Sequence, residues 1–139
     1  MTKHEIVLMS ITGEDKPGVT SSLTEILSKH NATILDIGQA NIHQSLSLGI
    51  LFRLDPVMQG NILKDLLFKS YELGVQAKFT PIERADYDQW VSRQGKESYV
   101  ITVLGQKIEA NQLAHVTKVI AEQGLNIDTI KRLTGRILL

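Results

Sequence analysis

The sequence of 139 residues contains no cysteine. This absence excludes disulfides, thiolate metal sites and a cysteine nucleophile, and it fits a reducing compartment. The chain also lacks net charge, because fifteen basic residues balance fifteen acidic ones, so no overall field draws it to nucleic acid or an anionic membrane. No apolar run approaches the roughly 18 residues of a membrane span or forms a signal peptide. We therefore expect a soluble, cytoplasmic protein.

Motifs for catalysis and metal binding are also missing. His4, His30, His43 and His115 are far apart and match no ligand spacing such as HExxH. The glycines do not fit the phosphate loop GxxxxGK[ST], and no GxSxG elbow supports a nucleophilic serine. An RNA-recognition module is disfavoured, because its central strands need aromatic side chains and the matching strands here offer only Phe52. We expect neither an enzyme nor a nucleic-acid-binding protein.

What is present is a regular alternation of strand and helix patterns. Residues 5–12 are apolar and β-branched, which indicates a buried strand. After Pro17 the apolar residues recur at helical spacing, which predicts a helix packed on a sheet. Residues 32–44 predict a second strand with a kink or register change near Gly38. Residues 45–54 alternate cleanly and complete a hairpin with that strand.

A second helix and a fourth strand complete the unit. Leucines and isoleucines at 62–67 mark the helix, Gly74 is placed to end it, and residues 75–83 predict the strand. The order βαββαβ within about 80 residues indicates an α+β, ferredoxin-like sandwich of two helices on a four-stranded antiparallel sheet. We place this first domain at residues 1–84.

The pattern then starts again after a polar linker at 85–97. Strands are predicted at 98–106 and 125–135, with a helix between them that ends at Gly124. Shifted back by about 93 positions, this segment aligns its apolar residues with those of the first unit, which indicates an internal repeat. Residues 98–139 are therefore predicted to be the first half, βαβ, of a second domain.

Half of this fold has unpaired strand edges. In a ferredoxin-like sheet the first two strands are not neighbours, because the third strand lies between them. A lone βαβ unit therefore favours association, and we expect either another chain to fill the gap or the chain to continue beyond it.

The loop GEDKPG between the first strand and helix has the composition of a ligand site. Gly13 and Gly18 allow a close approach of the backbone, and the N–H groups of the helix that starts near Pro17 favour a carboxylate. Asp15 is suited to an ammonium group, and an amino acid carries both charges. The alternative is an ordinary tight turn in which Asp15 or Lys16 is the N-cap.

Polar residues of the second strand are further candidates. Asp36 and Asn41 lie in a strand that we expect to be partly buried, so both need hydrogen-bond partners. The alternative is a pair of satisfied polar groups on an edge strand. Asn31 forms the turn into this strand and is predicted to face the GEDKPG loop, although the ordinary role of such a residue is a helix C-cap.

The stretch ITGEDKPGVTSSLTEILSKHNATILDIGQANIHQSLSLGILFRL resembles an ACT domain, the small-molecule-sensing module of amino-acid metabolism. Within it, DKPGVT and LDIGQANIHQSLSLGIL are similar to the amino-terminal region of phosphoserine phosphatases with tandem ACT domains. The resemblance covers nearly the whole chain and is stronger for the first copy. It implies a ferredoxin-like ACT domain followed by a partial second one.

The resemblance also implies a function. In that family a haloacid-dehalogenase-type catalytic domain with a DxDxT motif follows the ACT domains, and no such motif occurs here. The implied role is thus a regulatory part that catalyses nothing and holds no cofactor, whereas the parent enzyme would remove phosphate from phosphoserine with Mg²⁺. The implied ligand is L-serine, and the implied assembly is a homodimer or higher oligomer. The ligand-binding candidates are Asp15, Lys16, Gly18, Val19, Asn31, Asp36, Gln39, Asn41 and Gly105.

The second copy departs from the first at the loop. The positions that match Asp15 and Gly18 are Ile108 and Asn111, and only Gly105 keeps the glycine at the strand end. We therefore expect this copy to act as a partner surface, with Gly105 lining a shared interface.

Two alternatives within the ACT group stay open. One is a free-standing tandem-ACT regulator of glycine and serine metabolism, which needs a complete second copy. The other is the sensor of a formyltetrahydrofolate hydrolase, which carries a single ACT domain, so the repeat at 98–134 speaks against it.

Overall fold

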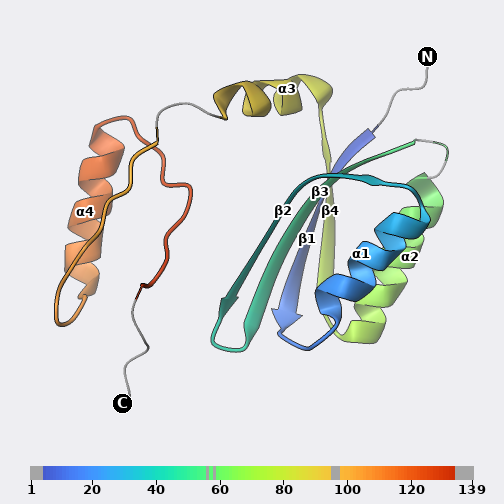
Figure 1. The fold of residues 1–139 in the computed structure, drawn as a ribbon, viewed down its shortest axis with the longest axis horizontal. Coiled ribbons are helices and arrows are strands. Elements are labelled where there is room, and N and C mark those ends of the chain that lie inside the picture. Colours follow the sequence, from blue (N-terminus) through green and yellow to red (C-terminus); the bar gives the residue numbers. More distant parts are fainter. Residues whose placement is uncertain (1–4, 56, 58, 95–97, 134–139) are drawn as a thin grey trace. The chain divides into compact units, whose positions relative to one another are not determined.

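The computed structural model describes residues 5–55, 57, 59–94 and 98–133. The chain divides into two compact units, residues 1–96 and residues 97–139, and each is described by itself. The first unit contains β1 (Glu5–Glu14), α1 (Val19–Lys29), β2 (Thr33–Ile42), β3 (Ser45–Leu54), α2 (Gln59–Leu73), β4 (Gln76–Ile82) and α3 (Arg84–Arg93) (Figure 1). The second unit contains α4 (Ala110–Glu122).

The first unit is the predicted ferredoxin-like sandwich. Its four strands are all antiparallel and follow the order β2-β3-β1-β4, so β1 and β2 are separated by β3. Figure 1 shows α1 and α2 side by side on the same face of the sheet, and the two helices contact each other. The fold class is therefore confirmed for this unit.

Alternating side chains of the two central strands form the centre of the core. Val7 of β1 lies opposite Phe52 of β3, and both are buried. Because successive strand residues point to opposite faces, every second residue of both strands reaches the helices. The helices meet them with apolar residues at four-residue spacing, namely Val19, Leu23 and Leu27 on α1 and Ile62 and Leu66 on α2.

The irregularity of β2 lies at a different place from the predicted one. Gly38 pairs regularly with Gly49, whereas the register of β2 against β3 shifts between Ile34 and Asp36. A bulge at this point lets β2 follow the twist of the sheet and restores the alternation further along. The loss of alternation in the sequence thus correctly predicts an irregularity in β2, but the irregularity lies between Ile34 and Asp36 and not near Gly38.

Most of the helix α3 lies within the predicted linker at 85–97. Tyr87 and Trp90 lie one turn apart on it, with ring centroids 6.0 Å apart. None of its residues is buried.

The second unit differs from the predicted βαβ half. The helix is present, but residues 98–109 and 123–133 form no strand in the part of the chain that the structure describes. The physical reason is that the two predicted strands are not neighbours in this fold, so they do not form a ladder with each other. Residues 134 and 135 of the second predicted strand lie outside the described residues.

Candidate functional site

The loop after β1 is fixed by contacts where the strand passes into it. The backbone N–H of Asp15 donates to the carbonyl of Gln44 in the β2–β3 turn, at 2.7 Å. At Gly13 the chain passes so close to Val75 that a Cβ there would lie 2.9 Å from the Val75 Cγ1. This close approach explains why a glycine occupies the next-to-last position of β1.

The helix behind this loop begins later than the sequence suggested. Val19 is its first residue and Gly18 is its N-cap, with a φ of 90°, so neither Asp15 nor Lys16 caps it. A left-handed N-cap turns the chain sharply, which the pattern around Pro17 did not reveal. No side chain bonds to the N–H groups of the first turn. These groups, with the positive end of the helix dipole, remain available to an anion.

A chain of hydrogen bonds joins this loop to α1 and β2. The Thr20 hydroxyl donates to Gln39 Oε1 at 2.7 Å, and Gln39 Nε2 donates to Asn41 Oδ1 at 3.3 Å. Asn41 Nδ2 in turn donates to Asp15 Oδ2 at 2.6 Å. We call these four residues, Thr20, Gln39, Asn41 and Asp15, the polar chain.

The register of β2 explains how the polar chain is placed. Gln39 pairs with Leu48 and Asn41 pairs with Leu46, and both leucines are buried beneath the helices. Gln39 and Asn41 therefore point to the helix side of the sheet, where α1 begins. Since β2 is the edge strand, this position is open to solvent, and both side chains are exposed.

The electrostatics of the polar chain suit a zwitterion. The carboxylate of Asp15 is bonded to a neutral amide, so its negative charge is not neutralised by that contact. Thr20, at the other end of the polar chain, lies in the first turn of α1, whose uncapped N–H groups favour a negative group. The arrangement therefore offers one place for an ammonium group and one for a carboxylate, with amides and a hydroxyl between them.

Lys16 and Val19 have other roles in this structure. Lys16 Nζ donates to the carbonyl of Leu73 at 3.3 Å, which ties the loop to the last turn of α2 and places a positive charge at its negative end. Val19 is 2% exposed and belongs to the core, so its side chain is not available to a ligand.

Asp36 lies away from the polar chain. It pairs with Leu51, at the bulge in β2, and its carboxylate accepts a hydrogen bond from the N–H of Ile37 at 2.9 Å. This local bond satisfies the backbone N–H group at the bulge. It agrees with the alternative that Asp36 is a satisfied polar residue on an edge strand.

Asn31 lies at the opposite end of α1 from the loop, contrary to the prediction. It adopts a φ of 55° just after the helix, and the following Ala32 N–H donates to the Leu27 carbonyl. Asn31 is thus the residue that ends α1, because asparagine tolerates the left-handed conformation. It lines a surface hollow of about 330 Å³ with Arg53 and Asp55.

Gly105 belongs to the second unit, where it lies in the irregular segment before α4. The nearest atoms to a Cβ at this position would come from Lys107 and Ile108, at 3.6 and 3.7 Å.

Thr20 is the member of the polar chain that the sequence did not reveal. Its signal was weak, because a threonine on the polar side of a helix is ordinary. Only the rotation of α1 relative to β2 brings its hydroxyl to Gln39.

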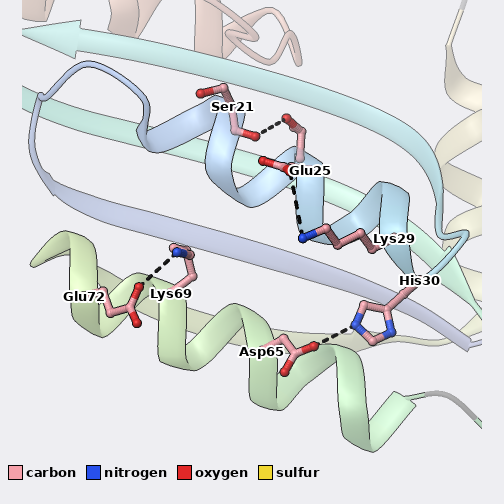
Figure 2. Close-up of polar contacts among 8 residues, drawn as sticks. Ser21, Glu25, Lys29, His30, Asp65, Lys69 and Glu72 are labelled. Atoms are coloured by element: carbon pink, nitrogen blue, oxygen red, sulfur yellow. Dashed lines mark hydrogen bonds and ion pairs between the residues drawn. The ribbon is translucent and has the colours of Figure 1, made fainter.

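Outside this site, the outer surface of the helix layer carries charged contacts. Figure 2 shows His30, which follows α1, reaching Asp65 on α2, with Nε2 and Oδ2 2.8 Å apart. Lys69 pairs with Glu72 on α2 at 2.9 Å. Across the described residues, no group of three or more histidines, aspartates or glutamates is placed to hold a metal ion. Nor is any helix among them long and apolar enough to cross a membrane.

Sequence profiles of the ACT domain match the chain twice, at residues 5–80 and at residues 97–136. Two curated relatives extend over about nine tenths of it. Phosphoserine phosphatase SerB2 of Mycobacterium tuberculosis is 38% identical over 128 residues, which is 90% of this chain and 30% of the relative. The phosphoserine phosphatase of Streptomyces coelicolor is 27% identical over 128 residues, which is 91% of this chain and 30% of the relative. The chain thus spans less than a third of the length of both relatives.

A solved structure is similar in fold. The formyltetrahydrofolate deformylase of Pseudomonas putida superposes with a TM-score of 0.51 at 15% identity, covering 86% of this chain and 57% of that one. At this identity the likeness concerns the fold alone.

Proposed function

Because the chain belongs to the ACT domain family, we propose that it is the amino-acid-sensing regulatory part of a cytoplasmic phosphoserine phosphatase and that its first unit binds L-serine. The names of the two phosphatase relatives support the parent enzyme. In this proposal the phosphatase reaction and its Mg²⁺ belong to a catalytic part outside the residues described here.

The observation that carries the proposal is the polar chain beside the uncapped start of α1. The carboxylate of the amino acid would lie against the first-turn N–H groups of α1, and its ammonium group against Asp15. The serine hydroxyl would exchange hydrogen bonds with the amide of Gln39 or the hydroxyl of Thr20, both of which are donors and acceptors. A ligand side chain without a polar group could not form these hydrogen bonds, which gives a physical basis for selectivity.

Isothermal calorimetry of the whole chain with L-serine tests this proposal, with glycine, phosphoserine and L-phenylalanine as competitors. We expect saturable heat with L-serine and at least about tenfold weaker binding in Asp15→Ala, because a hydrogen bond to a charged group contributes about 1.5–3 kcal/mol. Asp36→Ala is the matched control, since this carboxylate lies on β2, the strand that carries Gln39 and Asn41, but does not belong to the polar chain. Equal loss in both variants, or no heat with L-serine, would contradict the proposal.

We further propose that the first unit dimerises through the free edge of β2. Its ten residues include one charged residue, Asp36, no proline and no lysine, and Ile37 and Ile42 are exposed. The opposite edge strand, β4, carries Lys78 and Pro81, two residues that discourage strand pairing. A second copy at β2 would bring both polar chains to one interface, so that ligand binding and assembly become coupled.

Sedimentation equilibrium with and without L-serine tests the dimer. Ile37→Lys places like charges at the shared edge, and we expect it to raise the dimer dissociation constant at least about tenfold. Tyr71→Lys, on the exposed side of α2, is the control and should leave it unchanged.

A further inference from the structure

A surface hollow of about 330 Å³ lies in the first unit where α1 and β3 end. Its lining comes from the end of α1, the turn after it, the start of β2 and the end of β3. The polar chain lies at the other end of α1, so the hollow is separate from the proposed amino-acid site. Its polar and charged lining residues are Lys29, His30, Asn31, Thr33, Arg53 and Asp55.

Arg53 is the residue of this hollow whose side chain needs a partner. It pairs with Ile6 of β1 and Thr33 of β2 and is half-buried. Its guanidinium group is always charged and carries five donors in a planar fork. The side chain makes no hydrogen bond or ion pair with any residue that the structure describes. Since partial burial removes some of its hydration, this group favours an anion as its partner.

The residues beside Arg53 are of the kinds that bind an oxyanion. Asn31 and Thr33 carry neutral donors, and Lys29 adds a second permanent positive charge. Lys29 Nζ lies 3.9 Å from Glu25 Oε1, and because both side chains are largely exposed, this pair holds the lysine only weakly. Two cations that can bind one ligand are therefore present in the same hollow.

The other ionisable residues of the lining have contacts of their own. His30 Nε2 lies 2.8 Å from Asp65 Oδ2 (Figure 2), and Asp55 Oδ1 accepts a hydrogen bond from the N–H of Val57 at 3.1 Å. The carboxylate of Asp55 is a single negative charge against the two permanent positive charges of the lining. An anion therefore gains a net attraction in the hollow.

The end of α1 explains some of these charges without a ligand. Carbonyl groups at the end of a helix attract cations, which accounts for Lys29 and His30 at this place. The same reason does not apply to Arg53, because it lies on a strand. The case for a bound anion therefore rests on Arg53.

We propose that this hollow binds a phosphate group, with Arg53 as its main anchor and Lys29 as the second cation. A phosphate group carries up to two negative charges and three acceptor oxygens, so it matches two cations and two neutral donors better than a carboxylate does. The volume is near the lower limit of the about 300–1,000 Å³ of small-molecule sites, which favours a ligand smaller than a nucleotide. The proposal depends neither on L-serine nor on the parent enzyme.

An NMR titration of the whole chain with inorganic phosphate at constant ionic strength tests this site. We expect saturable shifts of the backbone amides of 29–33 and 53–55, which surround the hollow. The uncapped start of α1 is another place with free donors for an anion. Shifts confined to 19–21 at this start, or shifts that do not saturate, would overturn the proposal.

Substitutions of Arg53 test its role as the anchor. Arg53→Gln should weaken phosphate binding at least about tenfold, because it removes a charged donor with two contacts to the ligand. Arg53→Lys keeps the charge but not the fork and should weaken binding about threefold, which also provides a test if Arg53→Gln does not fold. Unchanged affinity in the Arg53 variant that folds would overturn the proposal.

Arg84→Gln is the matched control for net charge. It removes the same charge from α3, where Arg84 Nε lies 3.5 Å from Asp88 Oδ1, and it should leave the affinity for phosphate unchanged. Equal losses in Arg53→Gln and Arg84→Gln would mean that phosphate responds only to the charge of the whole chain, which would contradict a site in the hollow.

Two further ligands identify the chemistry and its source. Acetate carries one charge and should bind at least about tenfold more weakly than phosphate, and equal affinity would overturn the assignment to phosphate. Glycerol 3-phosphate is a phosphomonoester without an amino-acid group that the polar chain would bind. If it binds more tightly than inorganic phosphate, the ligand is a phosphorylated metabolite; otherwise it is free phosphate. L-serine should displace neither, and displacement would show that the hollow is not a separate site.

Discussion

Gly18 sets the direction in which α1 leaves the loop. Its φ of 90° lies where an L-residue costs about 1–2 kcal/mol. We therefore expect Gly18→Ala to lower the free energy of unfolding by about 1–2 kcal/mol in urea denaturation. Because the N–H groups of the first turn depend on this cap, calorimetric binding of the amino acid should weaken as well.

Gly60 provides the matched control for Gly18. It lies in the first turn of α2, and no atom is within 4 Å of the position that a Cβ would take. Gly60→Ala should therefore raise the free energy of unfolding, by at most about 1 kcal/mol. A loss of stability of similar size in both variants would show that the left-handed cap is not the cause.

At the same scale, the polar chain shows what single residues in a sequence can reveal. Asp15, Gln39 and Asn41 were candidates because of the loop composition and the resemblance to ACT domains, and the structure brings all three together. Val19 and Asn31 share the same stretch of sequence but not the same surroundings. Composition identifies polar residues near a loop. The burial of Val19 and the position of Asn31 at the end of α1 depend instead on how the chain folds.

At the scale of the element, a polar contact joins His30, the residue that follows α1, to Asp65 of α2. The atoms Nε2 and Oδ2 are 2.8 Å apart, and the His30 side chain is 15% exposed while that of Asp65 is 56% exposed. A double-mutant cycle with His30→Ala and Asp65→Ala should give a coupling energy of about 0.5–1 kcal/mol, because the contact is partly screened by solvent.

The pair Lys69 and Glu72 is the comparison for that cycle. It lies within α2 at 2.9 Å, so it adds nothing to the contact between helices. Its coupling should be about 0.2–0.5 kcal/mol and should fall with added salt. A coupling between His30 and Asp65 no larger than this would mean that the apolar core alone fixes the two helices.

Elements with strong local patterns could be predicted closely. β3 has the bounds Ser45–Leu54 that its clean alternation indicated, because each inward leucine or isoleucine is buried by the helices. The strand expected at 98–106 also has an apolar sequence, but this strand and the one expected at 125–135 are absent from the described part of the second unit. A strand is stabilised by pairing with another strand, which can be distant in sequence. The residues of the first strand do not show whether the second one is present.

At the scale of the whole molecule, the two units differ in how their structure is supported. The first unit has a continuous core that runs from Val7 to Val75, whereas no side chain from 98 to 133 is buried. Local stability follows buried apolar contacts and protected backbone hydrogen bonds. The backbone amides of the first unit should therefore be better protected from exchange than those of 98–106.

Hydrogen exchange of the whole chain tests this difference. We expect the amides of β1 and β3 to be strongly protected, because the two strands pair with each other over ten residues at the centre of the sheet. The amides of 98–106 should exchange faster, because this segment forms no strand in the part of the chain that the structure describes. Exchange of 98–106 as slow as that of β1 would contradict the prediction, because it would show that strand pairing is not what protects the amides of the first unit.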